Sequence, residues 1–265
     1  MRSLATFVLV PGFWLGGWVW EAVAARLRGA GHEVHAVTLA GLAERAGEAS
    51  PQVDVDAHVR DLVSLVEGRG LREVVLVGHS GAHMPVAGAV DVLAARSPGR
   101  VARVVYVDTA PMPSGMASLD FGPPGERAEV ERRAAEEGGG WLIPVPRFVP
   151  AEGPSLEGLS AADLEALRTR GTPQPLATAT QALRRPDPLP PVPSTMVACS
   201  MPVAAVRAMV ASGAPVFAPM AGPEWEFREL ATGHWPMLSE PAALAGLLAE
   251  ISERGPSVRG VCGRG

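Results

Sequence analysis

Ser80 lies where a run of strand-forming residues stops abruptly. The segment Glu73–His83 reads EVVLVGHSGAH, in which the apolar run breaks at Gly78 and a helical pattern follows. Gly-x-Ser-x-small residue between a strand and a helix is typical of a nucleophile elbow, a sharp turn that exposes a serine hydroxyl. The Gly81 N–H at the start of the helix is then a candidate oxyanion donor. The alternative is a buried glycine turn with an incidental serine.

A serine hydroxyl becomes a good nucleophile only when a base within hydrogen-bond reach takes its proton. His234, in ATGHWPM, follows the last predicted strand on a Gly/Pro-flanked loop and is the candidate base. The loop after the first predicted strand, Val10–Trp14, is the candidate source of a second oxyanion N–H, from Phe13. The alternatives are a surface histidine and an ordinary Pro-Gly turn.

Composition limits the classes of protein to which this chain can belong. Its 265 residues, 47% of them hydrophobic, fit one large α/β domain or a core with an inserted subdomain. A net charge of −5 provides no basic surface for nucleic acid or anionic membranes. Two cysteines argue against a disulfide framework, and no His/Cys cluster suggests a metal site. No G-x-G-x-x-G follows a strand and no G-x-x-x-x-G-K-[ST] occurs, so no cofactor is expected.

The early apolar run leads into Pro-Gly-Phe-Trp rather than into a small-residue cleavage site, so it does not resemble a signal peptide. No segment is long enough to cross a bilayer. We therefore expect a soluble cytoplasmic protein, monomeric or homodimeric, that acts on a small molecule.

Strand and helix patterns alternate along the chain, which predicts a mostly parallel sheet flanked by helices. The predicted strands are 4–10, 33–38, a third that leads into Ser80, 101–107, 194–200 and 225–230. The predicted core helices are 18–30, 54–66, 82–95 and 241–251. The composition changes between 111 and 193, which are rich in proline and glycine with helical pieces at 126–137 and 160–170.

The expected organisation is a core of residues 1–110 and 194–256 with an inserted, mainly helical cap at 111–193. The alternative for the insert is a disordered linker, which its content of large apolar residues disfavours. Residues 257–265 are predicted to be a disordered tail.

Taken together, these motifs resemble the α/β-hydrolase superfamily, in particular its compact branch of plant methylesterases, hydroxynitrile lyases and bacterial esterases. The resemblance covers most of the core and part of the insert. It rests on the segments LVPGFWLGGWVWE (9–21), GHEVHAVTLAGLAER (31–45), VLVGHSGAH (75–83), RVVYVDTAPMP (103–113), PQPLATATQAL (173–183) and TGHWPMLSEP (232–241). It implies an α/β-hydrolase fold of about six strands, with a cap over a mostly apolar pocket.

The chain departs from these relatives at the catalytic acid, which they usually carry just after the fifth strand. That region reads VACSMP (197–202) and contains no acid. An acid is needed to fix the tautomer of the catalytic imidazole. Asp108, at the end of the fourth predicted strand, is the best substitute, because some α/β hydrolases supply their acid from there. The alternative is a turn aspartate, and Glu226 and Glu229 are weaker candidates.

The predicted function is hydrolysis of a small to medium, largely apolar ester or lactone, with Ser80 as nucleophile and His234 and Asp108 completing a triad. Alternatives are a lyase, cyclase or decarboxylase on the same scaffold, or a ligand-binding protein without chemistry. The residues predicted to line the substrate pocket are Trp14, His83, Met112, Trp141 and Trp235.

Overall fold

The computed structural model describes residues 4–150 and 153–253 and contains a six-stranded, fully parallel sheet with the order β2-β1-β3-β4-β7-β8. The predicted tail at 257–265 lies outside these residues. The reversal of strand order between β1 and β3 is the topological switch point, where open α/β sheets bind their ligands. The strands are β1 (Thr6–Val10), β2 (Glu33–Ala36), β3 (Val74–His79), β4 (Val101–Val107), β7 (Ser194–Ala198) and β8 (Trp225–Glu229).

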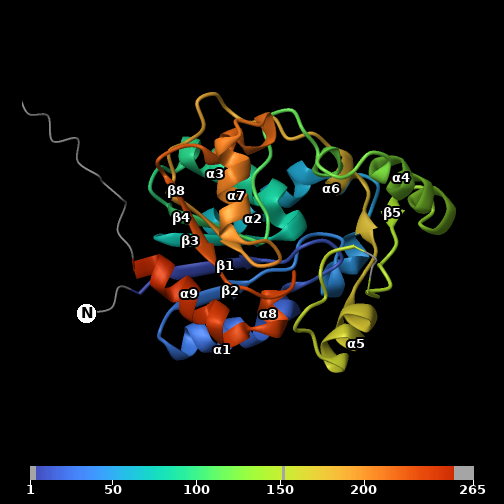
Figure 1. Cartoon of the computed structure of the whole chain (residues 1–265), viewed down its shortest axis with the longest axis horizontal. Helices are drawn as coiled ribbons and strands as arrows, with labels where there is room; N and C mark the ends of the chain where they lie inside the picture. The colour runs from blue at the N-terminus through green and yellow to red at the C-terminus, as the bar shows by residue number, and fades with distance from the viewer. Residues whose placement is uncertain (1–3, 151–152, 254–265) are drawn as a thin grey trace, which may run out of the picture.

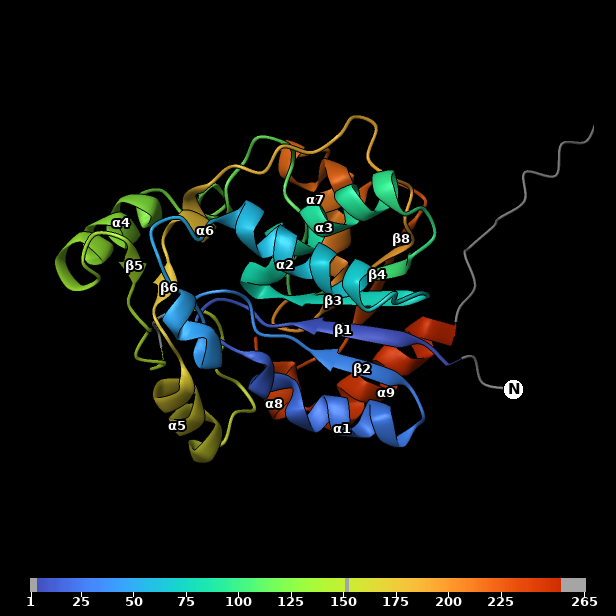
Figure 2. The ribbon, with the colours of Figure 1, turned by 180° about the vertical axis from the view of Figure 1, so that it is seen from behind.

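Helices cover both faces of the sheet (Figure 1), which explains why β1 and β3 are continuous apolar runs rather than alternating ones. Seen from behind in Figure 2, the same two layers lie on either side of the strands. One face carries α1 (Glu21–Gly29), α8 (Pro236–Ser239) and α9 (Pro241–Glu253). The other carries α2 (Val55–Gly68), α3 (His83–Arg96) and α7 (Val203–Ala211).

The insert between β4 and β7 lies at the carboxyl ends of the strands, on the right in Figure 1. Besides helices it contains a small antiparallel pair of strands, β5 with β6. That this insert forms a separate cap subdomain stays a prediction. Its main elements are α4 (Glu126–Glu137), β5 (Leu142–Ile143), α5 (Ala161–Arg170), β6 (Gln174–Pro175) and α6 (Ala177–Thr180).

Polar contacts attach the insert to the core at several places. The Trp14 N–H donates to Gln174 Oε1 at 2.8 Å, and Thr172 N–H donates to the Trp14 carbonyl at 2.9 Å. Arg185 forms a bidentate ion pair with Asp91 of α3, with nitrogen–oxygen distances of 2.8 and 2.9 Å. Because the guanidinium and carboxylate are both largely buried, this pair is screened less than a surface pair.

The local signals in the sequence place most elements to within two or three residues. Asp54 caps α2 by accepting from Ala57 N–H at 2.8 Å, and Ser160 and Asp163 form the predicted capping box of α5. Among the core helices, the sequence reasoning misses α7 and the short α8. Helix α7 begins directly after Pro202 and has a hydrophobic pattern with no side-chain N-cap, so no start signal marks it.

Candidate active site

Ser80 occupies the sharp turn between β3 and α3 and has a backbone φ of +50°, a left-handed conformation that is strained for a non-glycine residue. Two flanking glycines make this turn possible. A Cβ on Gly78 would lie 2.8 Å from a methyl carbon of Val86, and one on Gly81 would lie 2.4 Å from the Phe13 ring. The turn therefore has the geometry of the nucleophile elbow that the motif predicts.

A continuous chain of hydrogen bonds joins Ser80, His234 and Asp108. Ser80 Oγ lies 2.8 Å from His234 Nε2, and His234 Nδ1 lies 2.6 Å from Asp108 Oδ2. The His234 and Asp108 side chains are only 10% and 5% exposed, so water competes little for these bonds. A nucleophile, a base and an orienting acid require this order of hydrogen bonds.

Asp108 extends from the end of β4, yet its carboxylate is held by the end of β7. Its Oδ1 accepts from the backbone N–H groups of Cys199 and Ser200, each at 2.9 Å, and its Oδ2 accepts from Ser200 Oγ at 2.6 Å. Burial by itself would raise the pKa of Asp108. The bond from His234, with those from Ser200 and Cys199, outweighs it and holds the pKa below its usual range.

His79 fixes the loop that carries His234. Its Nε2–H donates to the His234 backbone carbonyl at 2.7 Å, and the centroids of the His79 and His234 rings lie 4.8 Å apart. Complete burial lowers the pKa of His79, so its ring is neutral and has one donor nitrogen. A second bond, from His234 N–H to the Ser155 carbonyl at 2.9 Å, ties the same loop to the insert.

The loop after β1 lies against the elbow. A Cβ on Gly12 would come 2.9 Å from Ser80 Cβ, so only glycine allows this approach without displacement. The next residues are Phe13, whose ring covers Gly81, and Trp14, which has a φ of +66° and is held by the insert. Within the described residues Phe13 N–H has no hydrogen-bond partner. The two predicted oxyanion residues, Phe13 and Gly81, are thus in contact beside the serine.

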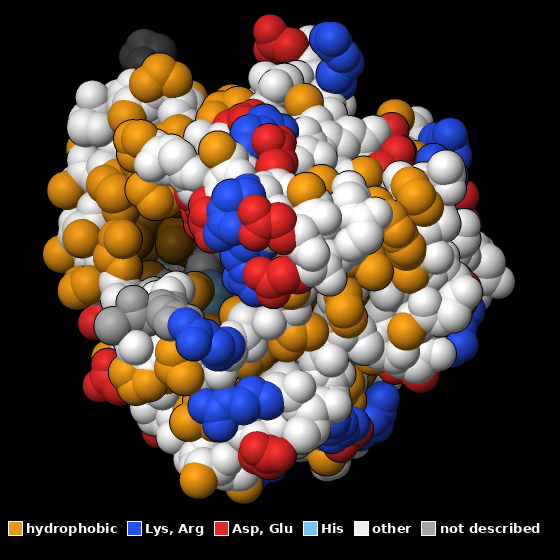
Figure 3. Space-filling model, turned by 90° about the vertical axis from the view of Figure 1, so that its right-hand side faces the viewer, with side chains coloured by type: hydrophobic (Ala, Val, Ile, Leu, Met, Phe, Trp, Pro, Cys, Tyr) orange, Lys and Arg blue, Asp and Glu red, His pale blue; other side chains and the backbone are white. Residues whose placement is uncertain are grey.

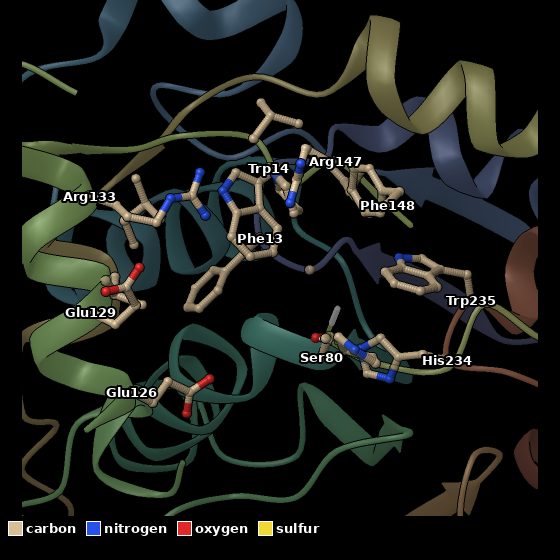
Figure 4. A pocket seen from close by; sticks show the side chains of 18 of the residues that line it. Phe13, Trp14, Ser80, Glu126, Glu129, Arg133, Arg147, Phe148, His234 and Trp235 are labelled. Atoms are coloured by element: carbon tan, nitrogen blue, oxygen red, sulfur yellow. Dashed lines mark hydrogen bonds between the residues drawn. The ribbon is translucent and has the colours of Figure 1, made fainter. Parts of the chain in front are cut away.

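Two cavities meet at Ser80 and His234. The larger, of about 700 Å³, lies beneath α4 and contains Trp14 and Trp235 in its wall, together with Phe148 (Figure 4). Its charged lining consists of Glu126, Glu129, Arg132, Arg133, Glu137 and Arg147. Three arginines and three glutamates therefore lie beside a wall that also contains large apolar side chains, with no excess of either charge.

The smaller cavity, of about 420 Å³, extends from the same serine towards β7 and α7. Its lining includes the predicted residues His83 and Met112, and its mouth exposes Phe121 and Met201. In the space-filling view the hollow has a hydrophobic rim on one side and charged side chains on the other (Figure 3). Trp141, at the start of β5, lines neither cavity.

Sequence reasoning missed several residues of this site. Ser200 lies in the region that contains no acid, and no signal in the sequence shows that its hydroxyl and N–H both bind Asp108. The charged side chains of α4 and Arg147 lie in the insert, where no local signal shows which residues face the serine. The bond from His79 to the His234 carbonyl also had no signal in the sequence, because the two residues lie 155 positions apart.

Within the described residues, no three His, Cys, Asp or Glu side chains are grouped as a metal site would require. None of the helices in that part of the chain is both long and apolar enough to traverse a bilayer.

The fold and the site together define an α/β hydrolase. The model of the alpha/beta hydrolase family matches residues 7–247, which is most of the chain. The protein therefore belongs to the alpha/beta hydrolase family.

Particular relatives are similar to parts or all of this chain. A carbendazim-hydrolysing esterase of Nocardioides sp. (strain SG-4G) is 39% identical over 105 residues, which are 40% of this chain and 42% of that protein. Methylesterase 7 of Arabidopsis thaliana is 32% identical over 103 residues, 38% of each chain. These matches thus span about two fifths of each curated relative.

Among solved structures, an extracellular alpha/beta-hydrolase from a Paenibacillus species superposes with a TM-score of 0.70. The superposition covers 93% of this chain and 98% of that one at 20% identity, so it demonstrates a shared fold.

Proposed function

We propose that the protein is a serine hydrolase that cleaves a small to medium, largely apolar ester or lactone through an acyl-enzyme on Ser80. The hydrogen-bonded chain from Ser80 through His234 to Asp108 carries this proposal. The two sequence relatives support the choice of an ester, because both are named as esterases. The apolar lining of the smaller cavity supports the choice of a largely apolar substrate.

In the first half of the reaction, His234 Nε2 takes the proton of Ser80 as Oγ attacks the ester carbonyl carbon. The carbonyl oxygen becomes an anion, which the N–H groups of Phe13 and Gly81 stabilise. Loss of one such donor typically costs about 3–4 kcal/mol of transition-state stabilisation. His234 then returns the proton to the departing alcohol oxygen, leaving the acyl group on Ser80.

In the second half, water enters, gives a proton to His234 and attacks the acyl carbon. The tetrahedral intermediate collapses, Ser80 regains its proton and the carboxylic acid leaves. Throughout, Asp108 keeps the proton of neutral His234 on Nδ1, so that Nε2 is free to act as base. In a lactone the departing alcohol stays attached to the acyl group, and the product is a hydroxy acid.

The test is covalent labelling by a fluorophosphonate, which reacts with serines activated in this way. Wild-type protein should acquire one adduct, located at Ser80 by peptide mapping, and should hydrolyse p-nitrophenyl acetate. Ser80→Ala should lose both properties and keep the wild-type circular dichroism spectrum. Ser252→Ala, a change on α9 remote from the site, is the matched control. A folded wild-type protein without an adduct would overturn the proposal.

A further inference from the structure

The smaller cavity has a lining suited to a flat, apolar group. Five of the nine methionines of the chain lie around it, and thioether sulfurs pack favourably against aromatic rings. Phe121 and Phe217 add an edge-to-face pair with ring centroids 6.3 Å apart. The five methionines are Met112, Met196, Met201, Met209 and Met220.

A polar pair is built into this lining. His83 Nε2 and Ser118 Oγ lie 2.9 Å apart, and both residues line the cavity. His83 belongs to the first turn of α3, and Ser118 begins a short turn in the insert. Burial lowers the pKa of His83 to about 4, with the Ala110 carbonyl opposing this effect, so the imidazole is neutral at neutral pH.

The pair retains hydrogen-bonding capacity that its own contact does not use. A serine hydroxyl donates one hydrogen bond and accepts two. Within the described residues, the bond to His83 is the one found for Ser118 Oγ. If His83 donates to Ser118, the hydroxyl proton of Ser118 remains free to donate to a ligand. If Ser118 donates to His83, the lone pairs of its oxygen remain free to accept from a ligand. In either tautomer, the half-buried Ser118 has an unused donor or acceptor beside the cavity.

The pair also lies close to the reacting centre. His83 begins α3 directly after the elbow that carries Ser80, and Ser80, His83 and Ser118 all line the smaller cavity. A group bonded to Ser80 would therefore extend past this pair as it enters the smaller cavity.

We propose that Ser118, oriented by His83, determines substrate specificity by binding a polar atom on an otherwise apolar, ring-shaped part of the substrate. The ligand class is a ring that carries a hydroxyl, carbonyl or ring nitrogen, held among methionines. This inference rests on the proposed function, because it assumes that the ring is one half of an ester cleaved at Ser80.

The first experiment compares esters that differ by one ring hydroxyl. Methyl phenylpropionate and its ring-hydroxylated isomers place the ring on the acyl side, and phenethyl acetate and its hydroxylated isomers place it on the alcohol side. In the series whose ring enters the smaller cavity, kcat/KM of wild type should favour the best hydroxylated isomer roughly 3- to 10-fold, as one neutral hydrogen bond allows.

Ser118→Ala should abolish this preference, so that the hydroxylated and unhydroxylated esters have the same kcat/KM to within about twofold. His83→Gln tests the orienting role and should reduce the preference without abolishing labelling of Ser80. Ser252→Ala should behave as wild type. A wild type without preference in either series, or a Ser118→Ala protein that keeps the preference, would overturn the inference.

A binding experiment separates this inference from the proposed function. Ser80→Ala protein is titrated with phenol and with toluene, and binding is followed by ligand-observed NMR. Phenol should bind roughly 3- to 10-fold more tightly than toluene, and adding Ser118→Ala should remove the difference. Equal binding of the two ligands would contradict the inference, whereas absent fluorophosphonate labelling of wild type would contradict only the hydrolase mechanism.

Discussion

The ends of strands β4 and β7 are neighbours in the sheet, but they make opposite contributions to the site. The β4 end supplies a carboxylate, Asp108, on a residue with a φ of +48°. The β7 end supplies no acid, and instead donates three hydrogen bonds to that carboxylate. The donors are the backbone N–H groups of Cys199 and Ser200 and the Ser200 hydroxyl. The pair is held in register by a bond from Asp108 N–H to the Val197 carbonyl at 2.8 Å.

In the proposed mechanism, this difference means that the position of the orienting acid is defined by His234 rather than by a particular strand. Adjacent strands lie about 4.8 Å apart, a distance that one aspartate side chain spans. A carboxylate attached to β4 therefore reaches the same imidazole nitrogen that one attached to β7 would reach. The strand without the acid becomes its hydrogen-bonding partner, which keeps the buried carboxylate ionised.

The largest effect is expected for His234→Ala, because both strand ends act only through this residue. Nucleophile and base act as a unit, so kcat should fall by about a millionfold. The measurement is steady-state hydrolysis of p-nitrophenyl acetate by folded protein. Retention of more than about one hundredth of the wild-type kcat would contradict a role for His234 as the base.

Moving the acid from β4 to β7 tests the equivalence of the two strand ends. The double variant Asp108→Asn/Ser200→Asp should be about 10- to 100-fold more active than Asp108→Asn, because a carboxylate is again close to His234. The single variant Ser200→Asp serves as control and should lose activity, since two carboxylates then compete for one site. A double variant no better than Asp108→Asn would show that the β7 end does not accept the acid.

Ser200→Ala should have a smaller effect, about 10-fold on kcat/KM, which is typical of one hydrogen bond to a charged group. The lost donor raises the pKa of Asp108 relative to wild type, so the variant should lose more of its activity below about pH 4 than at about pH 8. Ser200→Thr keeps the hydroxyl and should restore most activity. An equal loss at both pH values, unrescued by threonine, would indicate a purely structural role.

The smallest effect concerns stability. Because the pKa of Asp108 is lower in the folded protein than its ordinary value, its ionisation stabilises the fold above about pH 4, and this contribution disappears as the pH falls further. Asp108→Asn should therefore narrow the difference in unfolding free energy between about pH 5 and pH 3. Urea denaturation measures this, and an unchanged difference would contradict the depressed pKa.

Local signals in the sequence were enough for the parts of the site that one segment builds. The elbow around Ser80 follows from glycine spacing and strand pattern, and Asp108 follows from its place at a strand end. The partners of Asp108 on β7 and the lining contributed by α4 could not be predicted, because they depend on contacts between distant segments. Ser118 lacked a signal for the same reason: its partner His83 lies 35 residues earlier.

The central claim, that the acid acts from β4, is tested most directly by comparing Asp108→Asn with Glu229→Gln. Glu229 on β8 is one of the two weaker candidates for the acid, and its carboxylate accepts from Val203 N–H at the start of α7. We expect Asp108→Asn to lower kcat of p-nitrophenyl acetate hydrolysis by about 10⁴, and Glu229→Gln to leave it within about threefold of wild type. Full turnover by folded Asp108→Asn, with loss of turnover in Glu229→Gln, would contradict the account.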